Sequence, residues 1–519
     1  MGVQSKLTSV QGTDIYFGFN IFYGELHNMA LSSFLFLLFL FITLIFYYIL
    51  PKKFRWVWLL LASLAFVAFA DIKFVIVLVL ATLISYFAGI LISKSSDRKN
   101  KRIFLLSGIF LNLCLLFSFK YLNFFIGSFS QAINFAGISK QFAPIDLFLP
   151  LGISFYTFQA ISYLVDVYND VLPAEKNIGQ YSLYLSFFPK FISGPIERGG
   201  NLLPQLHSQK PFEYQRFLDG LVRIGWGFFK KLVIADRLAV VVNTVFSKPG
   251  EFYSPQLIVG ILAFSFQVYI DFSAYTDIAI GSARLFGIDL TENFNLPYLA
   301  TSVTDFWRRW HISLTSWLRD YIFIPLNFAA RRKRSSFYKY MNIVIVFLVS
   351  GIWHGANWTF IVWGLLHGVY QVVEAATQKI RDEFVKKFNI DRQSFGHKFW
   401  QVAFTFILVS FAWIFFRANS LQDAFLIIGK TFSANAITTN AAWNFMKLGL
   451  SASDGRIALI ALAIFVILEC SRYKTNMIQD LNRQPLVFRW FVYFILIFAV
   501  IFFGFFGTST PQSFIYAQF

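Results

Sequence analysis

The sequence predicts an all-α protein that crosses a membrane many times. Of its 519 residues, 57% are hydrophobic and only 14% are charged, whereas soluble domains carry roughly 25% charged residues. Long apolar stretches recur along the whole chain, and inside a bilayer such stretches form helices because a helix satisfies its own backbone hydrogen bonds. This composition excludes a soluble protein with a large core.

Thirteen stretches are apolar enough to form membrane helices, although several are shorter than the roughly 20 residues that cross the hydrocarbon. They are residues 31–50, 56–70, 74–93, 103–119, 148–167, 180–194, 226–247, 257–281, 340–352, 356–375, 398–416, 456–470 and 487–506. We expect about 11 full spans. We also expect re-entrant half-helices at 187–200 and around His354, because irregular backbone at membrane depth is tolerated only inside protein or along a cavity.

The net charge of +18 comes largely from short basic blocks between the apolar stretches. The blocks at 52–55 and 94–102 are separated by two predicted spans, so they lie on one side of the membrane, and a third block stands at 331–334. Because cytoplasmic loops are enriched in Lys and Arg, we place these loops in the cytoplasm and the N-terminus outside. The charge therefore does not indicate nucleic-acid binding, as it would in a soluble protein.

We expect one membrane domain over residues 29–510, preceded by a polar extension at 1–28 and followed by a short tail at 511–519. Met29 directly precedes the first apolar stretch, and we treat it as a hypothetical start of translation. No signal-peptide cleavage site follows that stretch, which leads into PKKFR.

Two polar segments interrupt the apolar pattern. Residues 198–231 mix charged and aromatic side chains and are expected to form a partly interfacial amphipathic region. Residues 376–397 are expected to be a solvated connector.

His311 is the first of two histidines in unusual surroundings. It lies in DFWRRWHISLTSWLRD (305–320), and ionisable side chains at membrane depth are functional candidates because they are costly there. If this segment is a helix, the spacing of its tryptophans places three of them on one aromatic face, namely Trp307, Trp310 and Trp317. The charges of Asp305, Arg308 and Arg309 can neutralise one another or hold an anionic group. Anchoring at the membrane interface by tryptophan and arginine is the alternative explanation.

His354 is the second such histidine. It lies in SGIWHGANWTF (350–360), directly after a tryptophan and between Gly351 and Gly355, and small residues let helices or substrates approach closely. Three tryptophans near it in the sequence could form flat aromatic walls of a site, namely Trp353, Trp358 and Trp363. The alternative is a packing histidine bonded to a backbone carbonyl. His367, which follows two leucines, fits that alternative well. His354 fits it less well, because a neutral imidazole among glycines is a poor choice for packing alone.

The chemistry that these residues permit is acyl transfer assisted by a histidine base. The chain has no phosphate-binding loop, nucleophile elbow or zinc motif, and Cys114 and Cys470 match no metal or disulfide spacing. A histidine can take the proton of an attacking hydroxyl without a metal, and His311 or Asn357 can stabilise the oxyanion that develops on a thioester donor. The residues permit this mechanism without selecting it, and they predict no metal and no bound cofactor.

Five strings in the chain resemble one known family, the membrane-bound O-acyltransferases, and within it the bacterial alginate O-acetyltransferase branch. They are LPLGISFYTFQAISYLVDVY (149–168), FFPKFISGPIERGGNLLPQL (187–206), DFSAYTDIAIGSARLFGIDLTENFNLPYLA (271–300), TDFWRRWHISLTSWLRDYIFIPL (304–326) and SGIWHGANWTFIVWGLLHG (350–368). Together with the N-terminal hydrophobic pattern, the resemblance spans most of residues 29–510.

The resemblance implies a ring-like bundle of tilted helices around a central tunnel. It also implies that His354, in the WHG motif, is the catalytic residue and that His311, in the WRRWH motif, is a second important residue. We expect His354 to act as a general base and His311 to orient it or to stabilise the oxyanion. The residues expected to shape the substrate site are Asn357, Trp353, Trp358, Trp310, Arg308 and Asp305.

By the same resemblance, we expect an O-acyltransferase of the bacterial inner membrane that passes acetyl groups to hydroxyls of an extracytoplasmic polysaccharide. Acetyl-CoA on the cytoplasmic side is the expected donor, and the transfer is either direct or relayed by an extracytoplasmic acetyltransferase partner. One departure is NFAARRKR (327–334), where many relatives carry Gly-Gly-Asn, and this change bears on donor access or partner docking.

Two rival interpretations stay open at this point. The first is D-alanyl transfer to teichoic acid, for which an acylated carrier protein replaces acetyl-CoA as the donor. The second is a transporter that moves an acyl donor or polymer without chemistry, in which case both histidines only line a pore.

Overall fold

The computed structural model describes residues 30–138, 142–208, 210–330, 336–433, 443–472 and 477–506. Within these ranges every regular element is a helix, which confirms the all-α prediction. The predicted extension at 1–28, the proposed start at Met29, the basic block at 331–334 and the tail at 511–519 lie outside the described residues.

The N-terminal part consists of helices with short connections. The elements are α2 (Phe34–Ile49), α3 (Lys52–Ala70), α4 (Ile72–Lys94), α5 (Arg98–Leu116), the π-helical turn η1 (Phe117–Tyr121) and α6 (Leu122–Phe135). Asp71 alone joins α3 to α4, and its carboxylate accepts a hydrogen bond of 2.8 Å from the Lys73 amide, which starts α4. Helices α3 and α4 pack together as an antiparallel hairpin. The basic start of α3 and the basic end of α4 therefore lie at the same end of this hairpin.

The middle of the chain is built around one long helix. The elements are α7 (Ile153–Tyr168), α8 (Ile178–Ser186), α9 (Phe188–Phe191), α10 (Gly199–His207), α11 (Tyr214–Phe228), the π-helical turn η2 (Phe229–Ala235), α12 (Asp236–Ser247), η3 (Pro249–Glu251) and α13 (Ser254–Leu285). Helix α13 has 32 residues, most of them buried. It packs against both α11 and α12, so it links the two halves of the molecule.

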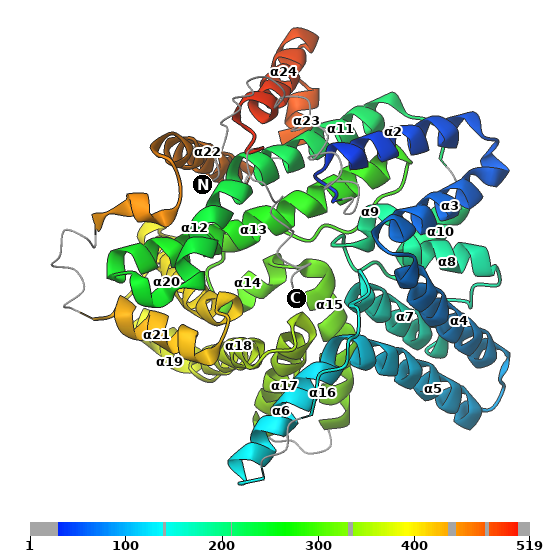
Figure 1. Ribbon diagram of the computed structural model, residues 1–519, viewed down its shortest axis with the longest axis horizontal. Helices are drawn as coiled ribbons and strands as arrows, with labels where there is room; N and C mark the ends of the chain where they lie inside the picture. Colours follow the sequence, from blue (N-terminus) through cyan, green and yellow to red (C-terminus); the bar gives the residue numbers. More distant parts are fainter. Residues whose placement is uncertain are drawn as a thin grey trace, which may run out of the picture.

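The C-terminal half begins with short helical elements. These are η4 (Pro297–Leu299), α14 (Val303–Arg309), α15 (Ile312–Leu318), η5 (Arg319–Phe323) and α16 (Ile324–Ala330). Longer helices follow: α17 (Ser336–His354), α18 (Trp358–Ala376), α19 (Gln378–Lys387), α20 (Phe395–Arg417), α21 (Leu421–Thr431), η9 (Phe445–Leu448), α22 (Ala452–Arg472), α23 (Met477–Asn482) and α24 (Leu486–Phe503). Figure 1 shows the other helices arranged around α14 and α15.

Seven helical segments of the described chain are long and apolar enough to cross a membrane. They are Lys52–Ala70, Ile72–Lys94, Arg98–Phe135, Ser254–Leu285, Phe337–His354, Phe395–Arg417 and Leu486–Phe503. Helix α24 buries none of its residues, and a helix that exposes so much apolar surface is stable where lipid covers it. The chain is therefore a multi-pass membrane protein.

Twelve of the thirteen predicted stretches coincide with helices, and one does not. The stretch 180–194 forms two short helices, α8 and α9, that break at Phe187. Pro189 stands in the first turn of α9, the one part of a helix where the missing proline amide costs nothing. The prediction of an interrupted segment is confirmed here. The segment around His354 is different, because it is the turn between two helices of 19 residues each, α17 and α18.

The buried side chains form two large cores and one small cluster between them. The N-terminal core joins α2–α5, α7, α8 and part of α13, and the C-terminal core joins α12, the other part of α13, α14, α18 and α20. The bridging cluster lies between α7, α15 and α17, and its members are Phe155, Phe158, Ile161, Ile196, Leu314, Trp317, Leu318, Val346 and Trp353. The site described below is built on this cluster.

The two polar segments behave differently. Residues 376–397 contain the exposed helix α19, which has no buried residue, so the expected solvated connector is confirmed as exposed. The interfacial interpretation of 198–231 is wrong at its C-terminal end. Lys230 and Lys231 are only 2% and 3% exposed, because carboxylates from α13 pair with them inside the protein, Asp277 with Lys230 at 2.6 Å and Asp271 with Lys231 at 2.9 Å.

Candidate active site

His354 is the last residue of α17 and is held by a tight hairpin. The next helix, α18, starts at Asn357, whose side-chain oxygen accepts a hydrogen bond from the Thr359 amide at 3.0 Å. The two helices touch through glycines, since a Cβ added to Gly364 would lie 3.2 Å from the Cα of Gly351 and would collide with the Phe347 carbonyl oxygen. The close approach of these backbones sets where His354 stands.

His311 occupies a sharp turn between α14 and α15. Its backbone has φ 43° and ψ 54°, the left-handed region that side chains with a Cβ rarely adopt and that costs of order 1 kcal/mol. Asn293 holds the turn from outside: its carbonyl oxygen accepts from the Ile312 amide at 2.9 Å and its side-chain oxygen accepts from the Ser313 amide at 3.2 Å. Strain of this kind is typical of functional sites.

The two histidines share one neighbour, Trp353. The ring centroids of His311 and Trp353 are 6.0 Å apart, and those of Trp353 and His354 are 4.9 Å apart. His311 is fully buried and His354 is 3% exposed. The two imidazoles are also near enough to interact electrostatically. The structure thus brings together the two residues on which the sequence argument rests.

An aromatic stack from α7 fixes Trp353 in turn. Phe158 stacks on Trp317 at 3.9 Å and on Trp353 at 5.4 Å between ring centroids, and Phe155 meets the edge of Trp353 at 5.4 Å. The indole nitrogen of Trp317 completes the arrangement, because it donates a hydrogen bond to the Phe158 carbonyl oxygen at 2.8 Å. Stacked aromatic rings of this kind are rigid, so Trp353 is a fixed wall between the histidines and α7.

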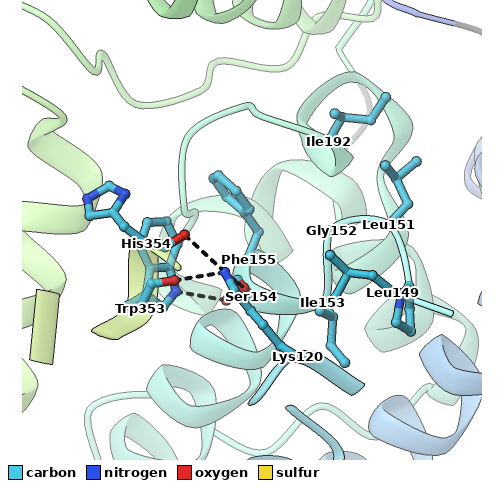
Figure 2. A pocket seen from close by; sticks show the side chains of 11 residues that line it. Lys120, Leu149, Leu151, Gly152, Ile153, Ser154, Phe155, Ile192, Trp353 and His354 are labelled. Atoms are coloured by element: carbon cyan, nitrogen blue, oxygen red, sulfur yellow. Dashed lines mark hydrogen bonds between the residues drawn. The ribbon is translucent and has the colours of Figure 1, made fainter. Parts of the chain in front are cut away.

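A small cavity opens beside this wall. It measures about 80 Å³ and is lined by Lys120, Leu149, Pro150, Leu151, Gly152, Ile153, Ser154, Phe155, Ile192, Trp353 and His354. Figure 2 shows its lining, with the imidazole of His354 directed away from Lys120. Mostly apolar walls with a few polar groups are typical of ligand pockets.

Lys120 is a residue of this cavity that the sequence argument missed. Its ammonium group donates to the Trp353 carbonyl oxygen at 2.8 Å, to the Ser154 hydroxyl at 3.1 Å and to the His354 carbonyl oxygen at 3.3 Å. The signal was present in the sequence, because Lys120 is a single charge inside the apolar run FSFKYLNFF. A charge in such a run is a functional candidate for the same reason as the two histidines.

Glu197 is a second residue that the sequence argument missed. It lies in the string GPIER (194–198) and connects this string to the loop that holds the His311 turn. Its carboxylate accepts hydrogen bonds from the Thr291 amide at 2.5 Å and from the Asn201 side chain at 2.6 Å. Burial raises the pKa of the Glu197 carboxyl, and these two hydrogen bonds oppose the shift. The adjacent Ile196 amide donates to the Ser313 hydroxyl at 3.0 Å, so the GPIER string supports the His311 turn from two directions.

The expected aromatic face over 305–320 is wrong, because this segment is not one helix. The left-handed backbone at His311 separates α14 from α15, and helical spacing does not continue across that turn. Its three tryptophans, Trp307, Trp310 and Trp317, are nevertheless all buried, with at most 4% of each exposed. They pack in the protein interior and do not anchor a helix at the interface.

The other predicted substrate-site residues lie in different places. Trp310 packs near the site, with its ring 5.1 Å from that of Trp413, which lies 5.8 Å from Trp363, a direct neighbour of His354. Asn357 uses its oxygen for the cap of α18 and donates its amide to the Asn419 carbonyl oxygen at 3.2 Å. Trp358 is exposed and contacts Phe124 at 5.8 Å between ring centroids.

The charged residues Asp305, Arg308 and Arg309 also lie outside the cavity. Asp305 binds Arg309 at 2.9 Å, which confirms that the charges neutralise one another, and Arg308 is exposed. His367 is fully buried and accepts a hydrogen bond from the Trp307 indole at 3.2 Å. It is therefore a packing histidine, although its partner is a side chain and not the expected carbonyl. Among the described residues no group of His, Cys, Asp and Glu is arranged to hold a metal ion.

Five sequence strings that lie far apart in the chain thus converge on one buried site in a membrane-spanning helical protein. Comparison with known proteins agrees with this architecture: residues 169–421 match the model of the membrane-bound O-acyltransferase family. The chain belongs to the membrane-bound O-acyltransferase family and is an acyltransferase. The resemblance drawn from the five strings is confirmed, and the transporter interpretation is set aside.

Several curated relatives are similar over most of their length. The probable alginate O-acetylase of Azotobacter vinelandii is 35% identical over 441 residues, which is 85% of this chain and 85% of that protein. The peptidoglycan O-acetyltransferase of Helicobacter pylori is 35% identical over 407 residues, 73% of this chain and 74% of its own. The teichoic acid D-alanyltransferase of Bacillus subtilis is 31% identical over 238 residues, 44% of this chain and 59% of its own.

Proposed function

We propose that this acyltransferase moves acetyl groups from acetyl-CoA on the cytoplasmic side to hydroxyls of an extracytoplasmic polysaccharide. The observation that carries the proposal is the meeting of His311 and His354 at Trp353 in the buried centre of the protein. The identity to two O-acetyl-transferring relatives extends over most of the chain. It favours acetyl transfer over D-alanyl transfer, because the similarity to two teichoic acid D-alanyltransferases covers less than half of the chain.

In this proposal His354 is the general base. Its imidazole takes the proton of the acceptor hydroxyl while the hydroxyl oxygen forms a bond to the thioester carbonyl carbon. The carbon–sulfur bond then breaks, and the thiolate of CoA takes the proton back from the imidazolium. The acceptor hydroxyl belongs either to the polysaccharide or to an extracytoplasmic acetyltransferase partner that relays the acetyl group.

His311 supports this reaction at the oxyanion. Its strained turn is held by Asn293 and by the GPIER string, so the imidazole is positioned before substrate arrives, and preorganised donors are the ones that stabilise a developing charge. Asn357 is less suited to this role because both ends of its amide are engaged in the hairpin. We keep Trp353 as the wall of the acetyl site.

The proposal extends to the membrane arrangement. Helices α2, α7, α18 and the continuous segment α11–η2–α12 add to the seven long spans and bring the total to about 11. A passage past α14 and α15 then connects the donor side with the acceptor side. The basic ends of α3 and α4 face the cytoplasm of a bacterial inner membrane.

The test measures acetyl transfer by purified membranes supplied with ¹⁴C-acetyl-CoA and alginate. We expect His354→Ala to abolish incorporation of label, and His207→Ala to leave it unchanged, because His207 is half-exposed and pairs with Glu175 at a distance of 2.6 Å. A His354→Ala protein that folds normally and still acetylates the polysaccharide would contradict the proposal. Label transfer from a D-alanyl carrier protein, with none from acetyl-CoA, would replace it with the D-alanyl alternative.

A further inference from the structure

Lys120 stands out among the charged residues of the membrane-spanning segments. It lies in the turn η1 within the continuous segment Arg98–Phe135, one of the seven candidate spans. In the part of the chain that the structure describes, its hydrogen-bond partners are one hydroxyl and two carbonyl oxygens, and no carboxylate pairs with it. By contrast, the interior residue Lys231 has two carboxylate partners, Asp236 and Asp271, each at 2.9 Å.

The two carbonyl oxygens belong to the end of the catalytic helix. The last carbonyls of any α-helix lack partners within the helix, and their dipoles give the C-terminus a partial negative charge that attracts a cation. Lys120 binds the carbonyl oxygens of Trp353 and His354, and the neighbouring Tyr121 hydroxyl donates to that of Ile352 at 3.0 Å. Adjacent residues of one π-helical turn therefore cover three successive carbonyls of α17.

The third partner of Lys120 joins this helix end to α7. The ammonium group has three donors, and the third binds the Ser154 hydroxyl at 3.1 Å. The carbonyl oxygen of Ser154 accepts a weak hydrogen bond from the Trp353 indole at 3.4 Å. A closed set of contacts thus links η1, α7 and the last turn of α17 (Figure 2).

We propose that Lys120 is a positioning residue that caps the C-terminus of α17 and so fixes the imidazole of His354 in its reactive place. It is not a catalytic residue, because Figure 2 shows the His354 ring directed away from it. A charge in a membrane segment is costly, and here the helix-end carbonyls and a hydroxyl compensate the charge of Lys120. This inference rests on the proposed role of His354 as the base.

The test compares Lys120→Met with Lys101→Met. Both substitutions remove a lysine charge from the same continuous segment, but Lys101 lies near its start and pairs with the largely exposed Asp170 at 3.4 Å. We expect kcat for acetyl transfer to fall by about 100-fold in Lys120→Met, because misplacement of a reacting group by about 1 Å has an effect of that order. KM for acetyl-CoA stays within about twofold, and Lys101→Met keeps both constants.

Added amines give a second measurement, because they show whether hydrogen-bond donors at this position are needed for kcat. Lys120→Ala leaves space at the edge of the cavity, and we expect ethylammonium to restore part of kcat because it donates hydrogen bonds to the same carbonyls. Tetramethylammonium carries the same charge without donors and is expected to restore nothing. Equal rescue by both ions would contradict the cap.

If Lys120→Met does not fold, Ser154→Ala tests the same contacts with a smaller change. It removes one of the three partners of the ammonium, and we expect kcat to fall several-fold with KM unchanged. A folded Lys120→Met enzyme with normal kcat, or with normal kcat and raised KM, would overturn the proposal, the second result indicating that Lys120 contacts the donor. Because His354→Ala is measured beside it, loss of activity there with full activity in Lys120→Met refutes only this inference.

Discussion

Gly351 of α17 and Gly364 of α18 face each other so closely that a methyl group on Gly364 would lie 3.2 Å from the Gly351 Cα. This contact stands three residues before His354, so it sets the position of the histidine through the backbone. Small residues at helix contacts allow this approach in membrane proteins. The position of His354 therefore depends on a pair of residues that carry no functional group.

Gly364→Ala is expected to lower acetyl transfer at least tenfold and to destabilise the protein by about 1–3 kcal/mol, because the methyl group collides with the Phe347 carbonyl oxygen. Thermal unfolding in detergent and acetyl transfer measure the two effects. Gly429→Ala in α21 is the control, because nothing lies within 4 Å of its added Cβ. A functional and fully stable Gly364→Ala protein would show that the hairpin can open without moving His354.

His311→Gly and His311→Ala both remove the imidazole, and we expect both to lose acetyl transfer. They differ in the backbone, since alanine is strained at φ 43° and glycine is not. The glycine variant is therefore expected to be more stable than the alanine variant by about 1 kcal/mol. Thermal unfolding of the two proteins under one condition gives the difference, and equal stability would mean that the turn relaxes when the ring is removed.

Lys231→Met leaves the carboxylates of Asp236 and Asp271 without their shared cation in the protein interior. We expect a loss of about 3–5 kcal/mol in the free energy of unfolding, because an uncompensated buried charge is costly. Combining it with Asp236→Asn and Asp271→Asn removes all three charges and should recover much of the loss. Unfolding curves of the single and triple variants test this, and an additive further loss in the triple variant would contradict it.

Glu197 gives the fold a pH dependence. Burial raises the pKa of its carboxyl above the ordinary value of 4.5, so the folded protein binds the proton more tightly than the unfolded chain does. Its contribution to stability is full below about pH 4.5 and is lost as the pH rises through the raised pKa. Glu197→Gln does not titrate, so its melting temperature should fall less than that of the native protein over this window, and parallel curves would exclude Glu197 as the source.

The helices of this protein could be predicted because each requires only an apolar run of sufficient length, and twelve of thirteen runs coincide with helices. The break at His311 could not be predicted in this way. Its left-handed backbone is held by Asn293, eighteen positions earlier in the chain, and spacing within 305–320 contains no trace of that contact. Local periodicity therefore suggested one helix where a distant loop imposes two.

The site was predicted through its two histidines, and their meeting at Trp353 agrees with that argument. Asn357 and Trp358 were drawn in because they follow His354 in the sequence, whereas the hairpin turns them away from the cavity. Lys120 was left out for the opposite reason, since more than two hundred residues separate it from its carbonyl partners. Nearness to His354 in the sequence therefore did not predict which residues line the cavity.

The three groups of buried residues have a mechanical consequence for catalysis. His311 packs on Phe272 of the N-terminal core, with ring centroids 4.7 Å apart, whereas His354 packs on Trp363 and Phe416 of the C-terminal core at 4.9 and 5.2 Å. Each imidazole therefore packs on aromatic rings of a different core, and the separation of the two rings depends on how α13, which belongs to both cores, holds them together. In the proposed mechanism, the contact between the two cores is therefore as important for acetyl transfer as the histidines themselves.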